Sequence, residues 1–307
     1  MLPQDGRDAT EFGAHLPLAD LGSGFSLAGL KTYARVADAL GYRYLCANDH
    51  LVFTRPWLDG PTALAAVLEE SGQMTLATTV SLLVVRGPVA LAKALTALDI
   101  LSEGRLMVVA GPGSSRLDYA AAGVPVEERW TRFDEAVPAL RALLRGQPGP
   151  PDGRFYALAD VRMAPARQGG TPVWVASWGS PAGLRRVQRD GDGWLASAYN
   201  TTAAHFASCV DVLGDLPNAI GTAWMYVTED VRQAETMIGD ILAPMLNRDA
   251  DELRAAALPI GPAELCAQRI SDYARAGAQR MFLWPLADHV VQLERFMADV
   301  APLVSGR

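Results

Sequence analysis

Short apolar segments recur along the chain, and this recurrence is what most limits the possible folds. Eight of them have the length and the apolar content of buried strands. They are Phe12–Leu18, Tyr42–Ala47, Met74–Leu82, Leu106–Ala110, Val173–Ser177, Trp194–Ala198, Ala219–Val227 and Met281–Trp284. Apolar residues at helical spacing lie between most of them. Eight strands alternating with helices in 307 residues predict a (β/α)8 barrel, and an open doubly wound sheet is the alternative.

The clearest repeating unit runs from Gln73 to Gly123. Its strand, which begins at Met74, leads to Gly87-Pro88, and a proline is well suited to the first position of a helix. The helix gives way to the strand Leu106–Ala110, which is followed by the glycine-rich sequence Gly111-Pro112-Gly113-Ser114. This pattern predicts a parallel βαβ unit with a flexible loop at the position where α/β folds bind their ligands.

Composition excludes several classes of function. The 27 basic and 34 acidic residues give a net charge of −7, which argues against a nucleic-acid-binding surface. The first residues do not resemble a signal peptide, and no apolar run is long enough for a membrane span. Three widely spaced cysteines and four histidines without HxH or HExxH spacing predict neither disulfides nor a metal site. We therefore expect a cytoplasmic protein that binds no metal.

One segment interrupts the alternation. Residues 146–170 are rich in proline and glycine and are too long for an ordinary connection between a helix and a strand. They are either a passive surface excursion or a lid over the site, and Arg154–Met163 has the pattern of a short hairpin. We find no linker, so residues 1–307 are expected to form a single domain.

In a barrel of this type, the functional groups lie at the carboxyl ends of the strands. The residues predicted there are His15, Asp49, His50, Thr79, Val80, Gly111, Gly113, Ser114, Ser177, Trp178, Gly179 and Ser180. His50 is the main catalytic candidate because an imidazole can give or take a proton near neutral pH. Asp49 could orient that imidazole or accept a hydrogen bond from a cofactor. Both could instead be ordinary strand-end residues, and His15 could line the pocket or pack in the core.

The sequence Gly179-Ser180-Pro181 has a physical reason to bind phosphate. Ser180 is a good N-cap and Pro181 a good first helical residue, so a helix is predicted to start here. A preceding glycine lets an anion approach the free N–H groups and the positive end of the helix dipole. The simpler interpretation is a capped helix that binds nothing.

Five blocks of sequence carry a resemblance that covers most of the chain. They are residues 34–52 (ARVADALGYRYLCANDHLV), 76–106 (LATTVSLLVVRGPVALAKALTALDILSEGRL), 123–144 (GVPVEERWTRFDEAVPALRALL), 171–197 (TPVWVASWGSPAGLRRVQRDGDGWLAS) and 273–286 (YARAGAQRMFLWPL). Together, and in this order, they resemble the bacterial-luciferase-like flavin and deazaflavin oxidoreductases. The resemblance implies a (β/α)8 barrel with an insertion before the fifth strand, a cofactor phosphate at Gly179-Ser180, and a cis peptide bond at Thr79-Val80.

The resemblance also implies a cofactor and a class of reaction. Residues 84–106 are most similar to the short deazaflavin-dependent members, which implies coenzyme F420 and hydride transfer to or from a small organic substrate. The alternatives are an FMN-dependent monooxygenase supplied by a separate flavin reductase, and a flavin-binding barrel without catalytic activity. Sugar-oxidising deazaflavin relatives carry a glutamate where this chain has Ser114, which argues against a sugar-phosphate substrate. Members of the family commonly pair, so a homodimer is expected.

Overall fold

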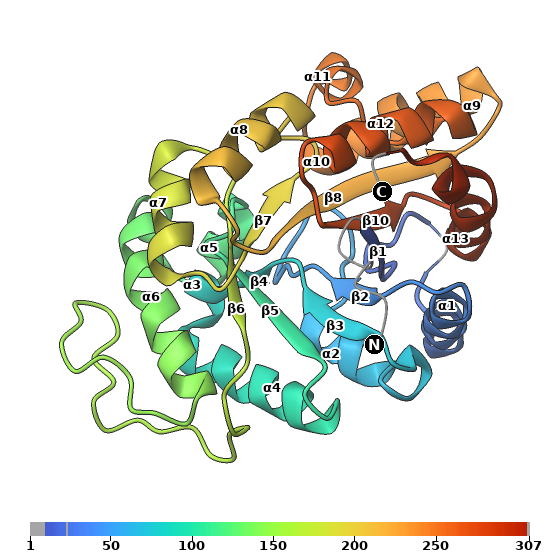
Figure 1. The fold of residues 1–307 in the computed structure, drawn as a ribbon. Helices are drawn as coiled ribbons and strands as arrows, with labels where there is room; N and C mark the ends of the chain where they lie inside the picture. The colour runs from blue at the N-terminus through green and yellow to red at the C-terminus, as the bar shows by residue number, and fades with distance from the viewer. Residues whose placement is uncertain (1–9, 23, 306–307) are drawn as a thin grey trace, which may run out of the picture.

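A computed structural model describes residues 10–22 and 24–305, in which eight parallel strands close into a barrel (Figure 1). Neighbouring strands follow the order β1-β2-β3-β5-β6-β7-β8-β10, and the barrel closes because β10 pairs with both β1 and β8. These strands are β1 Glu11–His15, β2 Tyr44–Ala47, β3 Thr75–Thr78, β5 Leu106–Gly111, β6 Val173–Ala176, β7 Trp194–Ser197, β8 Asn218–Val227 and β10 Arg280–Pro285. The predicted (β/α)8 barrel is thereby confirmed.

Helices surround the barrel on its outer side (Figure 1). The α-helices are α1 Leu27–Ala39, α2 Gly60–Ala66, α3 Leu83–Arg86, α4 Pro88–Leu101, α5 Arg116–Ala121, α6 Arg129–Leu144, α7 Pro181–Asp190, α8 Ala203–Leu213, α9 Val231–Thr236, α10 Ala243–Leu246, α11 Ala250–Ala255, α12 Ala263–Arg275 and α13 His289–Arg295. Two π-helical segments, η3 Met237–Leu242 and η4 Phe296–Val300, continue α9 and α13, and the short 3₁₀ segments are η1 Glu69–Ser71, η2 Val126–Glu128 and η5 Ala301–Leu303. Every helix between residues 10 and 305 that the structure describes is too short or too polar to cross a lipid bilayer.

A small cluster of side chains fills the inside of the barrel, separate from the larger core between strands and helices. Its buried members are Tyr44, Cys46, Ala77, Met107, Val109, Trp174, Leu195, Ala219 and Phe282. Gly13 belongs to the same layer, because a Cβ atom there would lie 2.7 Å from Phe282 and 2.9 Å from Tyr44. Side chains alternate along a strand, so the next inward position on each strand is two residues further on. Those positions lie at the carboxyl ends of the strands, where polar side chains first face the inside of the barrel.

The predicted strands agree with the observed ones, except that the third is interrupted. The apolar pattern predicts one continuous strand over Met74–Leu82, but β3 ends at Thr78 and a second short strand, β4 Ser81–Leu82, pairs with β5. The chain then turns directly into α3. The backbone N–H of Leu82 donates to the Asp49 carboxylate at 3.1 Å, which holds this segment over the end of β2. An apolar run does not reveal such a break, since both parts of it are buried.

The segment between α6 and β6 lies where the insertion was predicted, but it contains no hairpin. Residues 154–163 form no strand; the backbone of Leu158 exchanges hydrogen bonds with Gly149 and Pro150 instead. The segment is attached to the outer helices: Phe155 N–H donates to Glu135 of α6 at 2.9 Å, and Arg167 pairs with Asp99 of α4 at 2.7 Å. Its proline and glycine residues favour such irregular backbone over paired strands.

Candidate active site

The next inward-facing residues, two positions beyond the inner layer on each strand, lie at the carboxyl end of the barrel. They are His15 at the end of β1, Asn48 after β2, Thr79 after β3, Gly111 at the end of β5 and Trp284 in β10. Three of these were predicted as site residues, whereas Asn48 and Trp284 were not. The carboxyl end of a parallel barrel is where its loops carry binding and catalytic groups, so we take these residues as the floor of the candidate site.

One side of this floor is an aromatic stack. The imidazole of His15 lies on the indole of Trp284 with ring centroids 3.4 Å apart, and Trp224 of β8 stacks on Trp284 at 3.9 Å. The interplanar angles are 14° and 18°, so Trp284 is held between the other two rings. The indole of Trp57 meets Trp284 edge-on at 5.6 Å. This stack gives the site a rigid aromatic side.

His15 is a neutral hydrogen-bond acceptor. Its ring is buried, and Nδ1 lies 2.9 Å from the carbonyl oxygen of Leu16. A carbonyl can only accept, so Nδ1 carries the proton and Nε2 presents a lone pair. Burial lowers the pKa of His15 to about 3, against a smaller opposing effect of the Leu16 carbonyl. The residue therefore stays uncharged at any ordinary pH.

Several buried polar atoms at this end of the barrel have no hydrogen-bond partner among the described residues. They are Nε2 of His15, Oδ1 of Asn48, Oγ1 of Thr79 and the indole nitrogens of Trp57 and Trp224. Leaving a buried polar group unpaired costs about 1–3 kcal/mol. Buried polar groups are normally paired, so these atoms mark a place where water or another polar molecule would complete the hydrogen bonding.

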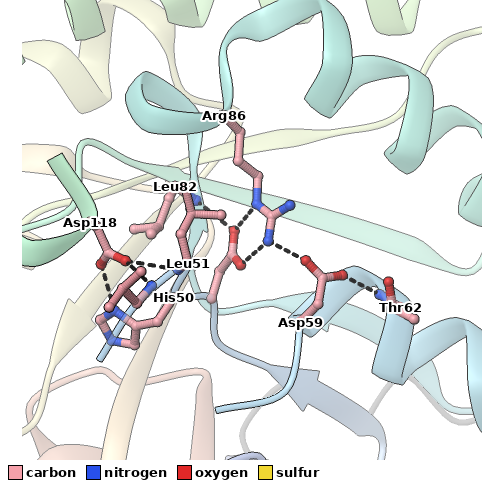
Figure 2. A network of polar contacts seen from close by, with 9 residues as sticks. His50, Leu51, Asp59, Thr62, Leu82, Arg86 and Asp118 are labelled. Carbon is pink, nitrogen blue, oxygen red and sulfur yellow. Dashed lines mark hydrogen bonds and ion pairs between the residues drawn. The ribbon is translucent and has the colours of Figure 1, made fainter. Parts of the chain in front are cut away.

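The second polar group of the site is formed by His50 and Asp118. Nδ1 of His50 lies 2.7 Å from Oδ2 of Asp118, in α5, while Oδ1 accepts from the backbone N–H groups of Leu51 and Val52 at 2.8 and 2.9 Å (Figure 2). Burial acts to raise the pKa of Asp118, but the His50 hydrogen bond and the two N–H groups outweigh it, so the pKa is lowered. The imidazole also stacks on Phe53 at 4.2 Å.

The prediction that Asp49 orients the neighbouring His50 is wrong. The buried carboxylate of Asp49 forms a two-pronged pair with the Arg86 guanidinium, with Nε–Oδ2 at 2.6 Å and Nη2–Oδ1 at 2.5 Å. Arg86 also pairs with Asp59, the N-cap of α2 (Figure 2). Successive residues at a strand end point in different directions, so adjacency in sequence did not bring these two side chains together.

The Gly179 turn is built as the sequence suggested. Ser180 caps α7 by accepting from the N–H of Gly183 at 3.1 Å, and Pro181 is the first helical residue. The hydroxyl of Ser177 accepts from the N–H of Gly179 at 3.2 Å. Gly179 has φ +92°, and a Cβ atom there would lie 2.5 Å from the His205 ring and 2.8 Å from the Cys209 sulfur of α8. Only glycine therefore fits between this turn and α8.

The remaining predicted residues surround the same end of the barrel. The Thr79-Val80 peptide bond is cis, as the resemblance implied. Gly111 faces Val80 closely, because a Cβ atom there would lie 2.7 Å from Cγ2 of Val80. Gly113 has φ +81°, and Ser114 is exposed. Trp178, 53% exposed, extends into solvent, so it lines no closed pocket in this structure.

Two hollows of about 490 and 450 Å³ lie elsewhere on the molecule. The first runs along the outer face of α7, between Asp134 and Arg185, and the second lies at the amino ends of β6 and β7, near Trp174 and Asp192. The first contains Arg186 and Arg189, which both already pair with Asp134. Neither hollow includes a residue of the stack or the His50–Asp118 pair, so the chemistry of the side chains, and not either volume, identifies the site.

Sequence reasoning missed Asp118, Arg86 and Trp224. Asp118 is the third residue after the N-cap Ser115, where an acid is common for reasons of helix stability alone. Arg86 and Trp224 lie within segments that were interpreted as a strand–helix connection and an apolar strand. A buried acid at a helix start is a weak signal, and its partner His50 is 68 residues away in the chain.

Comparison with known proteins agrees with this arrangement. Residues 9–211 match the family described as luciferase-like monooxygenase. A 206-residue part of the chain is 28% identical to the F420-dependent hydroxymycolic acid dehydrogenase of Mycobacterium tuberculosis, covering 62% of this chain and 56% of that protein. The F420-dependent glucose-6-phosphate dehydrogenase of Beutenbergia cavernae is 29% identical over 185 residues, which are 57% of this chain and 54% of that protein. The matched part thus spans little more than half the length of either relative.

Solved structures share the fold over nearly the whole chain. Monooxygenase RslO1 from Streptomyces bottropensis has a TM-score of 0.81 at 22% identity, covering 95% of this chain and 99% of its own. An F420-dependent secondary alcohol dehydrogenase in complex with an F420-acetone adduct has a TM-score of 0.80 at 18% identity, with coverages of 96% and 99%. The oxygenating constituent of 3,6-diketocamphane monooxygenase from Pseudomonas putida, in complex with FMN, has a TM-score of 0.71 at 15% identity, with coverages of 96% and 98%. At these identities the likeness concerns the fold.

Proposed function

Because the chain belongs to the luciferase-like monooxygenase family, we propose that it is an oxidoreductase that uses reduced coenzyme F420 to transfer hydride to or from a small organic substrate. Both relatives compared above by sequence carry F420-dependent activities in their names, which supports the deazaflavin. Neither name fixes a substrate for this chain, since the match covers only part of each relative.

The observation that carries the proposal is the set of unpartnered polar atoms beside the aromatic stack. A deazaflavin or flavin ring is flat and carries hydrogen-bonding groups along its edge. The rigid aromatic stack around Trp284, together with the unpartnered Oγ1 of Thr79 and Oδ1 of Asn48, supports a site for such a ring at this end of the barrel. The Ser177–Ser180 turn, with glycine at its apex and a helix behind it, fits the phosphate of the same molecule. The bound cofactor would supply the redox chemistry, and the protein supplies orientation and proton control.

His50 is the residue we assign to proton control. It follows β2 at the catalytic end of the barrel, and its side chain is only 14% exposed. Nδ1 of His50 is hydrogen-bonded to Asp118, whereas Nε2 has no hydrogen-bond partner in the described part of the chain. This nitrogen is available to the hydroxyl or carbonyl oxygen that gains or loses a proton when hydride moves.

FMN is the second candidate cofactor. A protein of the same fold, the oxygenating constituent of 3,6-diketocamphane monooxygenase, is in complex with FMN, which supports this flavin as a candidate. The same turn and the same aromatic stack would hold FMN, and a separate flavin reductase would then have to supply it in reduced form. The alternative reaction is oxygenation of the substrate, and the third possibility is a barrel that binds flavin without turnover.

The decisive experiment titrates the full-length protein with F420 and with FMN, followed by fluorescence and calorimetry. Reduced cofactor is then mixed with a panel of ketones and aldehydes, and oxidised cofactor with the matching alcohols, with and without oxygen. We expect micromolar or tighter F420 binding and oxygen-independent turnover. Tight FMN binding without detectable F420 binding would overturn the cofactor assignment, and binding without turnover across the panel would support the non-catalytic alternative.

A further inference from the structure

Asp118 divides its two carboxylate oxygens between different tasks. Among the residues described, the donors to Oδ1 are the backbone N–H groups of Leu51 and Val52, and the donor to Oδ2 is the His50 ring. The first contact attaches the loop after β2 to α5, while the second acts on the imidazole. A residue needed only to hold the loop would require a single oxygen.

The contact through Oδ2 determines which nitrogen of His50 carries a proton. An ionised carboxylate can only accept hydrogen bonds, and the lowered pKa of Asp118 keeps it ionised at neutral pH. Nδ1, at 2.7 Å, must therefore be the donor. When the ring is neutral, Nε2 is then the acceptor, which is the form that a proton-accepting catalyst needs.

The plane of the ring is fixed by other groups. Phe53 stacks on the imidazole at 4.2 Å and 27°, and Trp57 meets it edge-on at 4.9 Å and 82°. These aromatic contacts limit rotation of the ring but do not distinguish its two nitrogens. Among the charged residues on the surrounding segments that the structure describes, Asp49 is paired with Arg86, while Arg55, on the loop, and Arg116, on α5, form no hydrogen bond or ion pair with the ring. Asp118 is thus the only charged group in the described structure that contacts His50.

We propose that Asp118 is the positioning residue for His50: it holds the proton on Nδ1 and so presents Nε2 to the reacting oxygen. The inference rests on the proposed function, in which His50 exchanges a proton with substrate. In this assignment Asp118 acts only through the His50 ring.

The structure suggests a variant that separates the two tasks. In Asp118→Asn the remaining carbonyl oxygen still accepts from Leu51 and Val52, so the loop stays attached. The amide NH₂ then faces Nδ1 as a donor, which forces Nδ1 to become the acceptor and moves the ring proton to Nε2. Asp118→Ala removes both contacts. Asp59→Asn is the matched control, because it also removes a carboxylate of the same polar region but one without contact to His50.

The test uses ¹⁵N-labelled protein and two-bond ¹H–¹⁵N spectra, in which the two neutral forms of imidazole differ; the His50 signals are assigned with His50→Gln. We expect a proton on Nδ1 in the wild type and in Asp59→Asn, and on Nε2 in Asp118→Asn. Single-turnover rates of Asp118→Asn should fall by roughly 10²-fold or more, with cofactor affinity within about twofold of the wild type.

Two results would overturn the inference: an unchanged proton position in Asp118→Asn, or a switched position with a wild-type rate. The spectra need no substrate. If no substrate is ever turned over, the proposed function fails, while the spectra still decide whether Asp118 sets the proton position. If Asp118→Ala does not fold, the Asp118→Asn comparison remains complete.

Discussion

At the residue scale, the site contains two histidines with opposite environments. His15 is buried, stacked and held neutral, whereas His50 is partly exposed and paired with a carboxylate. Both present Nε2 as a hydrogen-bond acceptor in the neutral form. Only His50 combines a carboxylate on one ring nitrogen with a second ring nitrogen that has no partner among the described residues, which is why we assign proton transfer to it.

This difference predicts the effect of replacing His50. His50→Ala should fold and bind cofactor nearly as well as the wild type, since its ring is not part of the aromatic stack, but it should lose roughly 10²–10⁴-fold in turnover. Single-turnover rates and cofactor titrations of the same preparation test this. Wild-type rates in the variant would show that His50 is only a strand-end residue.

The neutral state of His15 predicts a dependence of stability on pH. The pKa of a histidine side chain is ordinarily 6.5, and that of His15 in the folded protein is about 3. Below about pH 6.5 the unfolded chain therefore gains a proton that the folded chain does not, so stability falls with pH until about pH 3. The slope reaches about 1.4 kcal/mol per pH unit, or roughly 2 kcal/mol lost between about pH 6.5 and about pH 5.

Urea unfolding of the wild type and His15→Gln at about pH 7.5, 6 and 5 measures this contribution. The glutamine variant starts less stable because it lacks the stacked ring, but its stability should decline less steeply. Other acidic groups contribute equally to both proteins and cancel in the difference. Parallel curves would contradict the assignment of a buried neutral imidazole.

At the element scale, the barrel was predictable because buried parallel strands are short apolar runs separated by helices. All eight strands were located to within a few residues, and so was the helix that starts at Pro181. The break after Thr78 and the irregular course of residues 154–163 were not, because neither changes the apolar pattern. The polar pairs of the site were also missed, since Asp118 and Arg86 meet their partners only after the barrel has closed.

Because Gly179 lies so close to α8, we predict that enlarging this residue selectively weakens binding of the cofactor phosphate. In Gly179→Ala the added methyl collides with His205 and Cys209 and displaces the turn. We expect at least about tenfold weaker FMN binding, a loss of about 1.4 kcal/mol, with little change for riboflavin, which lacks the phosphate.

Gly214→Ala is the matched control. Gly214 also has a positive φ, +63°, but no atom lies within 4 Å of its added Cβ atom. This variant should lose about 1 kcal/mol of stability from backbone strain and keep the wild-type preference for FMN over riboflavin. Equal losses for FMN and riboflavin in Gly179→Ala would place the phosphate elsewhere.

At the scale of the whole molecule, the outer helices expose large apolar side chains. Leu101 of α4 is 64% exposed and Val231 at the start of α9 is 72% exposed, although isolated apolar residues are common on protein surfaces. The family resemblance implies a homodimer, and an interface between two copies of the chain would cover some of these exposed side chains.

Light scattering tests the expected dimer directly. At micromolar concentration we expect a mass about twice the 32.8 kDa of one chain. The measurement should be repeated at high salt, since an apolar interface is insensitive to ionic strength. A mass of one chain under both conditions would reject the dimer.

The attachment of the insertion to α4 and α6 has a consequence for engineering the chain. Thr10 donates to the carbonyl of Ala278, and the N–H of Ser305 donates to Ser271, so the two ends of the described chain are tied to neighbouring positions around the end of α12. A peptide linker that joins these ends, with new termini cut at the exposed Asp152, would give a circular permutant. The Pro150–Leu158 hydrogen bond would still join the two sides of the cut, and Arg167 would still hold the second side to Asp99. The strand order of the barrel would be untouched, so the enzyme could carry a fused reporter on its outer side.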